Sequence, residues 1–247
     1  MSIESPEQLI ALRDIGRICH LALREMANNC EPGIATQELA DIGTKVMREN
    51  GARSAPAKVY GFPGEICISV NEEAVHGIPG QKKLEPGDLV KLDVTFEKNG
   101  YMGDAAITVP VEPASDEARR LVRCAERAFY AAMRVARAHH RVNEIGRAVE
   151  REVGRSGFSV VRELGGHGIG RTIHEPPSVP NFEDRNARQR LTAGLVITVE
   201  PIIAIGAGRT KTAEDGWTER TVDGGLSAHF EHTIVITQRA PVLLTAA

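Results

Sequence analysis

Apolar and polar residues recur with two different periods along this chain, and the change of period separates predicted helices from predicted strands. Apolar residues return every three or four positions in residues 6–28, after a cap at Ser5, which predicts an amphipathic helix. A second amphipathic helix is predicted to follow, with Thr36 as its N-cap residue. Short apolar or alternating runs then predict strands at residues 53–60 and 66–70.

The strongest local signal is the dipeptide Asn99-Gly100, because a type I′ hairpin turn needs two residues that tolerate positive φ. Counting outward from this turn pairs Thr95 with Asp104 and places Asp93 on the same face. The two carboxylates are then diagonal neighbours, about 7–8 Å apart. Like charges this close on an apolar hairpin repel each other and resist desolvation, so we expect a compensating cation.

The order of elements repeats in the second half of the chain. Ser115 caps a long helix that is predicted to reach about His139. A shorter helix follows at residues 143–156, and Gly157 ends it as Gly51 ends its counterpart. This repetition predicts two similar α+β halves that share one sheet, with a site between them.

The second half also carries three predicted strands, at residues 158–162, 195–201 and 228–237. We see no linker or low-complexity tract between the halves. Residues 1–247 are therefore predicted to form a single catalytic domain with halves at about 1–110 and 115–247.

Composition excludes several classes of function. The 247 residues carry a formal net charge of −3 and no run of basic residues, which argues against binding nucleic acid or a membrane surface. The N-terminus lacks the pattern of a signal peptide, and no stretch has the length of a transmembrane helix. Four widely spaced cysteines predict free thiols in a reducing cytoplasm: Cys19, Cys30, Cys67 and Cys124.

A glycine-rich stretch surrounds His167. The run from 165 to 170 allows close approach of the backbone and places the imidazole at the end of a strand. A nucleotide-binding loop is the alternative, but the glycine spacing differs from that fingerprint. Pro176 and Pro177 also forbid the long helix that should follow. We therefore expect His167 to serve as a ligand or catalytic group.

Two further carboxylates, Glu200 and Glu231, stand in otherwise apolar predicted strands. Taken singly, such a residue is more often a strand end or half of an ion pair. Together with Asp93, Asp104 and His167 they form a set of four carboxylates and one imidazole without a thiolate. This set suits a hard or borderline divalent ion, and it is large enough to bridge two ions around an activated water.

These residues belong to motifs that resemble those of the type I methionine aminopeptidases. The motifs, which span nearly the whole chain, are Asn71-Glu72 with His76-Gly77-Ile78-Pro79, the Asp93/Asp104 hairpin, Gly166-His167-Gly168-Ile169-Gly170-Arg171 with His174-Glu175, Glu200-Pro201, Trp217-Thr218, and Glu231-His232-Thr233. The resemblance implies the α+β pita-bread fold, with a curved, mainly antiparallel sheet. It also implies removal of N-terminal methionine from nascent proteins and peptides with a small second residue, using two divalent ions (Co, Mn, Fe or Zn).

The resemblance further implies a role for each residue. Asp93 would bind one ion, His167 and Glu200 the other, and Asp104 and Glu231 both. Glu200 would also carry a proton from the attacking water to the leaving amine.

Other implied roles concern the substrate. His76 and His174 would contact the substrate beside the scissile amide, with His174 stabilising the oxyanion. Thr95, between the two aspartates on the same face, is a candidate to hydrogen-bond a metal-bound water. The pocket for the methionine side chain would include Phe62, Cys67 and Trp217.

Four departures from the family pattern fall around this pocket: Val59 and Ile173, where aromatic residues are common, Gly64-Glu65, where Lys-Ser is usual, and His229, where glutamine is common. They leave the predicted ligands intact and put side-chain preference in question. The main alternatives are a pita-bread peptidase that cleaves next to proline, whose members carry a large extra N-terminal domain, and a non-catalytic binding protein. The expected partners are a peptide or nascent-chain N-terminus and, transiently, the ribosome; we expect a monomer.

Overall fold

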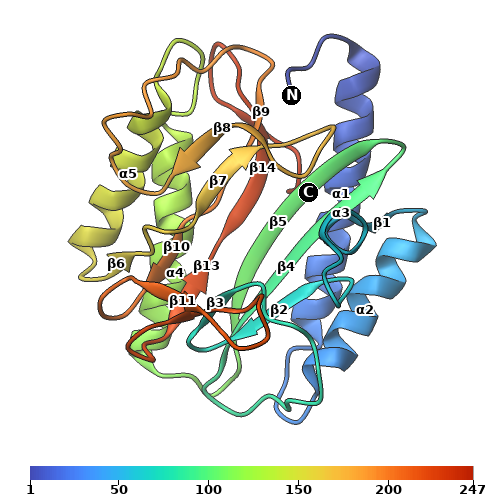
Figure 1. Ribbon diagram of the computed structural model, residues 1–247, viewed down its shortest axis with the longest axis vertical. Helices are drawn as coiled ribbons and strands as arrows, with labels where there is room; N and C mark the ends of the chain where they lie inside the picture. The colour runs from blue at the N-terminus through green and yellow to red at the C-terminus, as the bar shows by residue number, and fades with distance from the viewer. Residues whose placement is uncertain (247) are drawn as a thin grey trace.

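One large antiparallel sheet, with one pair of helices packed against each half of it, is the centre of the computed structural model, which describes residues 1–246 (Figure 1). The helices are α1 (Pro6–Asn28), α2 (Thr36–Glu49), α3 (Ala55–Tyr60), α4 (Asp116–Met133) and α5 (Val142–Arg155). The sheet strands are β1 (Arg53–Ser54), β2 (Cys67–Val70), β4 (Leu89–Lys98), β5 (Tyr101–Pro110), β7 (Gly165–Gly168), β8 (Glu175–Pro180), β9 (Val196–Val199), β14 (Glu231–Val235) and β15 (Val242–Leu243).

The order of strands brings the two halves of the chain together. It runs β1-β4-β5-β14-β9-β7-β8, with β2 beside β4 and β15 beside β14. Strand β5 of the first half therefore pairs directly with β14 of the second. The predicted α+β fold with a shared, mainly antiparallel sheet is confirmed, and residues from both halves meet near this seam.

Two small three-stranded sheets lie beside the large one and cover one end of the seam. One has the order β13-β10-β6 and the other β11-β12-β3. Their strands are β3 (Glu73–Val75), β6 (Ser159–Val160), β10 (Ile202–Ala204), β11 (Thr210–Thr212), β12 (Glu219–Thr221) and β13 (Ser227–His229).

The predicted hairpin has the predicted register. Asn99 and Gly100 have φ values of 54° and 79°, as a type I′ turn requires. Thr95 lies opposite Asp104, and Asp93 lies opposite Ala106. A local turn signal has thus fixed the relative position of two acidic residues in a ten-residue strand pair.

Two expectations for the first half are wrong. Residues 55–60 form a helix instead of a strand, because the Ser54 hydroxyl accepts a hydrogen bond from Ala57 N–H at 3.2 Å and Pro56 fits the first turn. Thr36 is the first residue of α2 instead of its cap, and its hydroxyl pairs with Gly80. The cap position is Ala35, whose N–H donates to Glu38.

In the second half, the predicted long helix is too long. Helix α4 ends at Met133, because the N–H groups of Ala138 and His139 donate to the carbonyls of Thr237 and Leu191. These tertiary partners replace the intrahelical ones, and His139 has a φ of 73°, which a helix cannot contain.

The predicted strands of the second half are shorter than expected. Strand β6 has two residues, and β9 covers only 196–199 of the predicted 195–201. The predicted last strand is two strands in different sheets, since His229 pairs with Ile202 whereas Glu231 pairs with Ala106.

Two apolar cores fill the space between the sheet and the helix pairs. One lies under α1 and α2, and the other lies around Phe129 of α4. Helices α2 and α5 are both followed by a glycine with positive φ, Gly51 (71°) and Gly157 (80°), as the repeat predicts. None of the helices in residues 1–246 has the length and apolarity needed to cross a membrane.

Candidate metal centre and substrate pocket

A cavity of about 250 Å³ opens at the seam between the two halves of the sheet. Its wall combines strand residues of both halves with the turn after α3 and the loop that precedes β12. All ten site residues predicted from the sequence line it: Phe62, Cys67, His76, Asp93, Asp104, His167, His174, Glu200, Trp217 and Glu231.

The hairpin supplies two of the carboxylates, Asp93 from β4 and Asp104 from β5. Asp104 is 6% exposed, and its carboxylate accepts a hydrogen bond from the Thr95 hydroxyl at 2.9 Å. The backbone of Asp104 is fixed to β14, because its N–H and carbonyl both bond the Thr233 hydroxyl. Thr95 thus holds a carboxylate in place, and its expected hydrogen bond to a metal-bound water stays a prediction.

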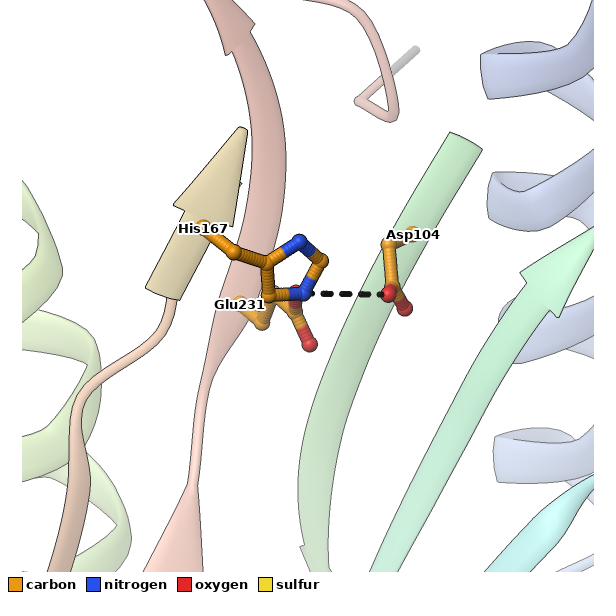
Figure 2. Close-up of side chains that lie close together, drawn as sticks. All are labelled: Asp104, His167 and Glu231. Carbon is orange, nitrogen blue, oxygen red and sulfur yellow. Dashed lines mark ion pairs between the residues drawn. The ribbon is translucent and has the colours of Figure 1, made fainter. Parts of the chain in front are cut away.

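His167 projects from β7 toward these carboxylates. Figure 2 shows its ring pointing toward Asp104, with Glu231 close by; Nε2 lies 3.8 Å from Asp104 Oδ2. The other ring nitrogen, Nδ1, is 3.0 Å from the Gly168 carbonyl. Because Nδ1–H donates to that carbonyl, the Nε2 lone pair is left facing the carboxylates, which is the tautomer a metal ligand needs.

The glycines beside His167 permit this position. A Cβ on Gly166 would lie 2.5 Å from the Thr198 carbonyl, and one on Gly168 would lie 2.3 Å from the Pro176 carbonyl. Strand β7 can therefore approach β8 and β9 closely only with glycine at both positions. The glycines are therefore needed so that β7 can pack closely against its neighbours and hold the His167 imidazole in this position.

Glu200 enters from the end of β9. The Thr198 hydroxyl donates to its Oε1 at 2.9 Å and accepts from His167 N–H at 3.0 Å. Glu200 Oε1 is 3.6 Å from His167 Nε2. One threonine thus positions both groups relative to each other.

Burial gives the cluster unusual proton affinities. Removal from water raises the pKa of Asp104 to about 8, assisted by the Glu200 charge, and raises that of Glu200 to about 7. Burial and the neighbouring carboxylates also raise the pKa values of Asp93 and Glu231. Burial lowers the pKa of His167, so its ring is neutral. Four carboxylates cannot all ionise here without a cation.

The donor set fits divalent metal ions. Asp104, His167 and Glu231 each offer one atom, and these atoms lie within 4.8 Å of one another. Glu231 Oε1 is buried and lacks a hydrogen-bond partner among residues 1–246. Carboxylate oxygens with one neutral imidazole suit hard or borderline divalent ions, and such ions would supply the positive charge that the carboxylates need.

The apolar part of the cavity has the predicted members. Phe62 and Trp217 meet edge to face, with ring centroids 5.4 Å apart, and Cys67 lies opposite Asp93 in the strand register. Burial raises the pKa of the Cys67 thiol, so it stays neutral. Ile173 adds a buried aliphatic surface. These side chains form a slot that would suit a thioether.

Two histidines flank the cluster. His76 has a φ of 58°, an uncommon conformation for a residue other than glycine, and its carbonyl accepts a bond from the Thr218 hydroxyl at 3.4 Å. The rings of His174 and His167 meet edge to face, with centroids 4.2 Å apart. Partial desolvation and that neighbour lower the pKa of His174 to about 4, so its ring is neutral.

Sequence reasoning missed Tyr60, which lines the cavity and bonds His174. Its Oη lies 2.6 Å from His174 Nδ1, and desolvation raises the pKa of the phenol, so the hydroxyl keeps the proton that it can donate to a neutral Nδ1. The neighbouring Val59 is exposed. We missed this contact because residues 53–60 were predicted to form a strand. Residues 55–60 form helix α3 instead, and the helical turn decides which side chain faces the cavity. Thr198 was also missed, although strand alternation places it on the Glu200 face.

The whole chain is similar to known peptidases. The model of metallopeptidase family M24 matches residues 11–238. Methionine aminopeptidase 2 of Bacillus subtilis (strain 168) is 43% identical over 247 residues, covering 99% of each protein. A crystal structure of methionine aminopeptidase from Rickettsia prowazekii has a TM-score of 0.95 at 34% identity, covering 99% of this chain and 100% of that one. Prolidase from Pyrococcus furiosus shares the fold, with a TM-score of 0.80 at 22% identity and 65% of its length covered.

Proposed function

Because the chain belongs to metallopeptidase family M24 and is similar over nearly its whole length to methionine aminopeptidases, we infer that it is a metal-dependent aminopeptidase that removes N-terminal methionine. The preferred substrates are peptides and nascent chains with a small second residue. The observation that carries this conclusion is the buried cluster of four carboxylates and a neutral imidazole beside an apolar slot.

The proposed centre would hold two divalent ions. Asp93 would bind one ion, His167 and Glu200 the other, and Asp104 and Glu231 would contribute to both. When bound, the ions supply Lewis-acid polarisation of the scissile carbonyl and a water that is nucleophilic at neutral pH. The hydrogen bonds of Thr95 and Thr198 to Asp104 and Glu200 support this assignment, since metal ligands are commonly oriented by such partners.

The protein's own groups are assigned the remaining steps. Phe62, Cys67 and Trp217 hold the methionine side chain and exclude water from it. His174 carries its proton on Nε2, because Nδ1 accepts from Tyr60, and it donates to the developing oxyanion. Glu200 accepts a proton from the attacking water and delivers it to the leaving amine.

Release of free methionine from a Met-Ala-Ser peptide tests this function. We expect turnover that stops in excess chelator and returns with added metal, while an Xaa-Pro peptide stays intact. Asp104→Asn keeps the shape of the side chain and should abolish turnover, whereas Asp41→Asn, at an exposed position, should not change it. Turnover by the Asp104 variant, or cleavage of only the Xaa-Pro peptide, would contradict the proposal.

A cytoplasmic location, a monomeric state and transient contact with the ribosome complete the proposal. The location is supported by four free cysteines, three of them buried. Light scattering of the purified chain tests the monomer, and co-sedimentation with translating ribosomes tests the contact. A dimer mass, or absence from the ribosome pellet at low salt, would contradict the respective part.

A further inference from the structure

His229 is a buried polar residue, and the lack of hydrogen bonds to its ring within residues 1–246 is not explained by the ligands of the proposed centre. It ends β13, is 1% exposed and lines the cavity. Neither of its ring nitrogens has a hydrogen-bond partner in the described part of the chain. Buried polar atoms are nearly always paired, so an orphaned imidazole beside a metal centre points to a partner other than protein.

The distances from His229 match those between ligands of one ion. Its Nε2 lies 3.3 Å from Glu231 Oε2 and 4.0 Å from Glu200 Oε2. These three residues each offer one atom within 4.8 Å of the others. Ligand atoms that are each about 2.0–2.2 Å from a shared ion lie about 3–4 Å apart. The arrangement therefore suits coordination.

We propose that His229 is a further ligand of the centre, joining Glu200 and Glu231 around one divalent ion. This inference rests on the proposed function. With His167 assigned to the same ion, that site has two imidazoles, while the ion assigned to Asp93 has carboxylates only. The two sites then differ in preference: the imidazole-rich site favours zinc or cobalt, and the carboxylate site accepts harder ions such as manganese.

Cobalt binding to the metal-free full-length chain tests the proposal. X-ray absorption of the cobalt-loaded parent should show imidazole scattering from both His167 and His229. His229→Gln should lose about half of that contribution, and its calorimetric titration should show one binding event weakened at least about tenfold. His139→Gln, which alters an exposed histidine far along the chain, is the matched control and should leave both readouts unchanged.

The outcomes separate the inference from the proposed function. Unchanged scattering in the His229 variant overturns the inference; if its affinity falls without a change in scattering, His229 positions Glu231 instead of ligating. If the His229 variant fails to fold, the X-ray absorption of the cobalt-loaded parent protein tests the proposal by itself. Scattering from the imidazole of His167 alone would overturn it. A parent that binds no cobalt refutes the proposed metal centre itself.

Discussion

Metal binding to this protein should release more protons at pH 6 than at pH 9. The perturbation is addition of a divalent ion to the metal-free chain, and the relevant groups are Asp104 and Glu200, whose pKa values are raised by burial to about 8 and about 7. Carboxylates must lose their protons before they bind metal. Whatever protons these two residues hold in the free protein therefore appear in the solvent.

The size of the effect follows from these two pKa values. At about pH 6, Asp104 is almost fully protonated and Glu200 about nine-tenths protonated, so together they release about two protons per chain. At about pH 9 they hold only about a tenth of a proton between them. The expected difference is thus nearly two protons, and the apparent affinity rises with pH over this window.

Calorimetric titration in two buffers of different ionisation enthalpy measures the protons released at each pH. Asp104→Asn should reduce the release at about pH 6 by about one proton, provided that it still binds one ion, and Asp41→Asn should leave it unchanged. Equal proton release by the parent at both pH values would refute the reasoning, because the carboxylates would then be ionised before the metal arrives.

The same shifts act on the stability of the metal-free protein. The folded pKa values of Asp104 and Glu200 lie above the unfolded values of about 3.9 and 4.3, so the folded state binds more protons. Their contribution to stability is complete below about pH 4 and is lost as the pH rises through 7 to 8. Urea unfolding of metal-free and metal-loaded protein at several pH values should show this loss only without metal.

Three further predictions concern single substitutions. Tyr60→Phe removes the donor to His174 Nδ1, so kcat should fall about fivefold, the equivalent of one neutral hydrogen bond of about 1 kcal/mol, with KM nearly unchanged; a change in KM alone would contradict a positioning role. Gly168→Ala places a Cβ 2.3 Å from the Pro176 carbonyl, so metal affinity measured by calorimetry should fall at least about tenfold as β7 shifts; unchanged affinity would show that the strand can adjust. Phe129→Ala empties a fully buried site in the larger core and should lower the free energy of unfolding by about 3–5 kcal/mol in urea, and a loss under 1 kcal/mol would contradict tight packing there.

Local signals in the sequence determined the parts of this protein that depend on near neighbours. Asn99-Gly100 set the hairpin register, since few dipeptides accept positive φ at both positions, and the register placed Asp93 and Asp104 on one face. Helix α1 was predicted with its observed bounds, because its cap and its apolar period lie within the segment itself.

Charged residues within apolar runs also indicated two residues of the cavity, whereas the flanking histidines and the apolar pocket residues were implied by the family resemblance. Glu200 and Glu231 are costly in such strands unless something compensates them, and this cost is visible without a structure. All ten predicted residues line one cavity. Their assignment to individual ions stays a prediction.

Only the tertiary structure decided where strands and helices meet distant partners. Helix α4 ends early because Thr237 and Leu191 supply acceptors for the following N–H groups. The chain leaves one sheet for another between His229 and Glu231, although both sides have the same strand-like composition. Neither event has a local signal, since both depend on which distant backbone is available for pairing.

The pairing of polar side chains was likewise decided in three dimensions. Strand alternation relates His229 to Glu231, but it cannot tell whether an imidazole finds a hydrogen-bond partner elsewhere. Tyr60 reaches His174 across 114 positions of sequence, through the turn of a helix that the local pattern did not predict. The sequence was enough to predict residues that line the cavity, because cost and spacing are local. The fold decided which of their atoms face one another, because that depends on the packing of both halves.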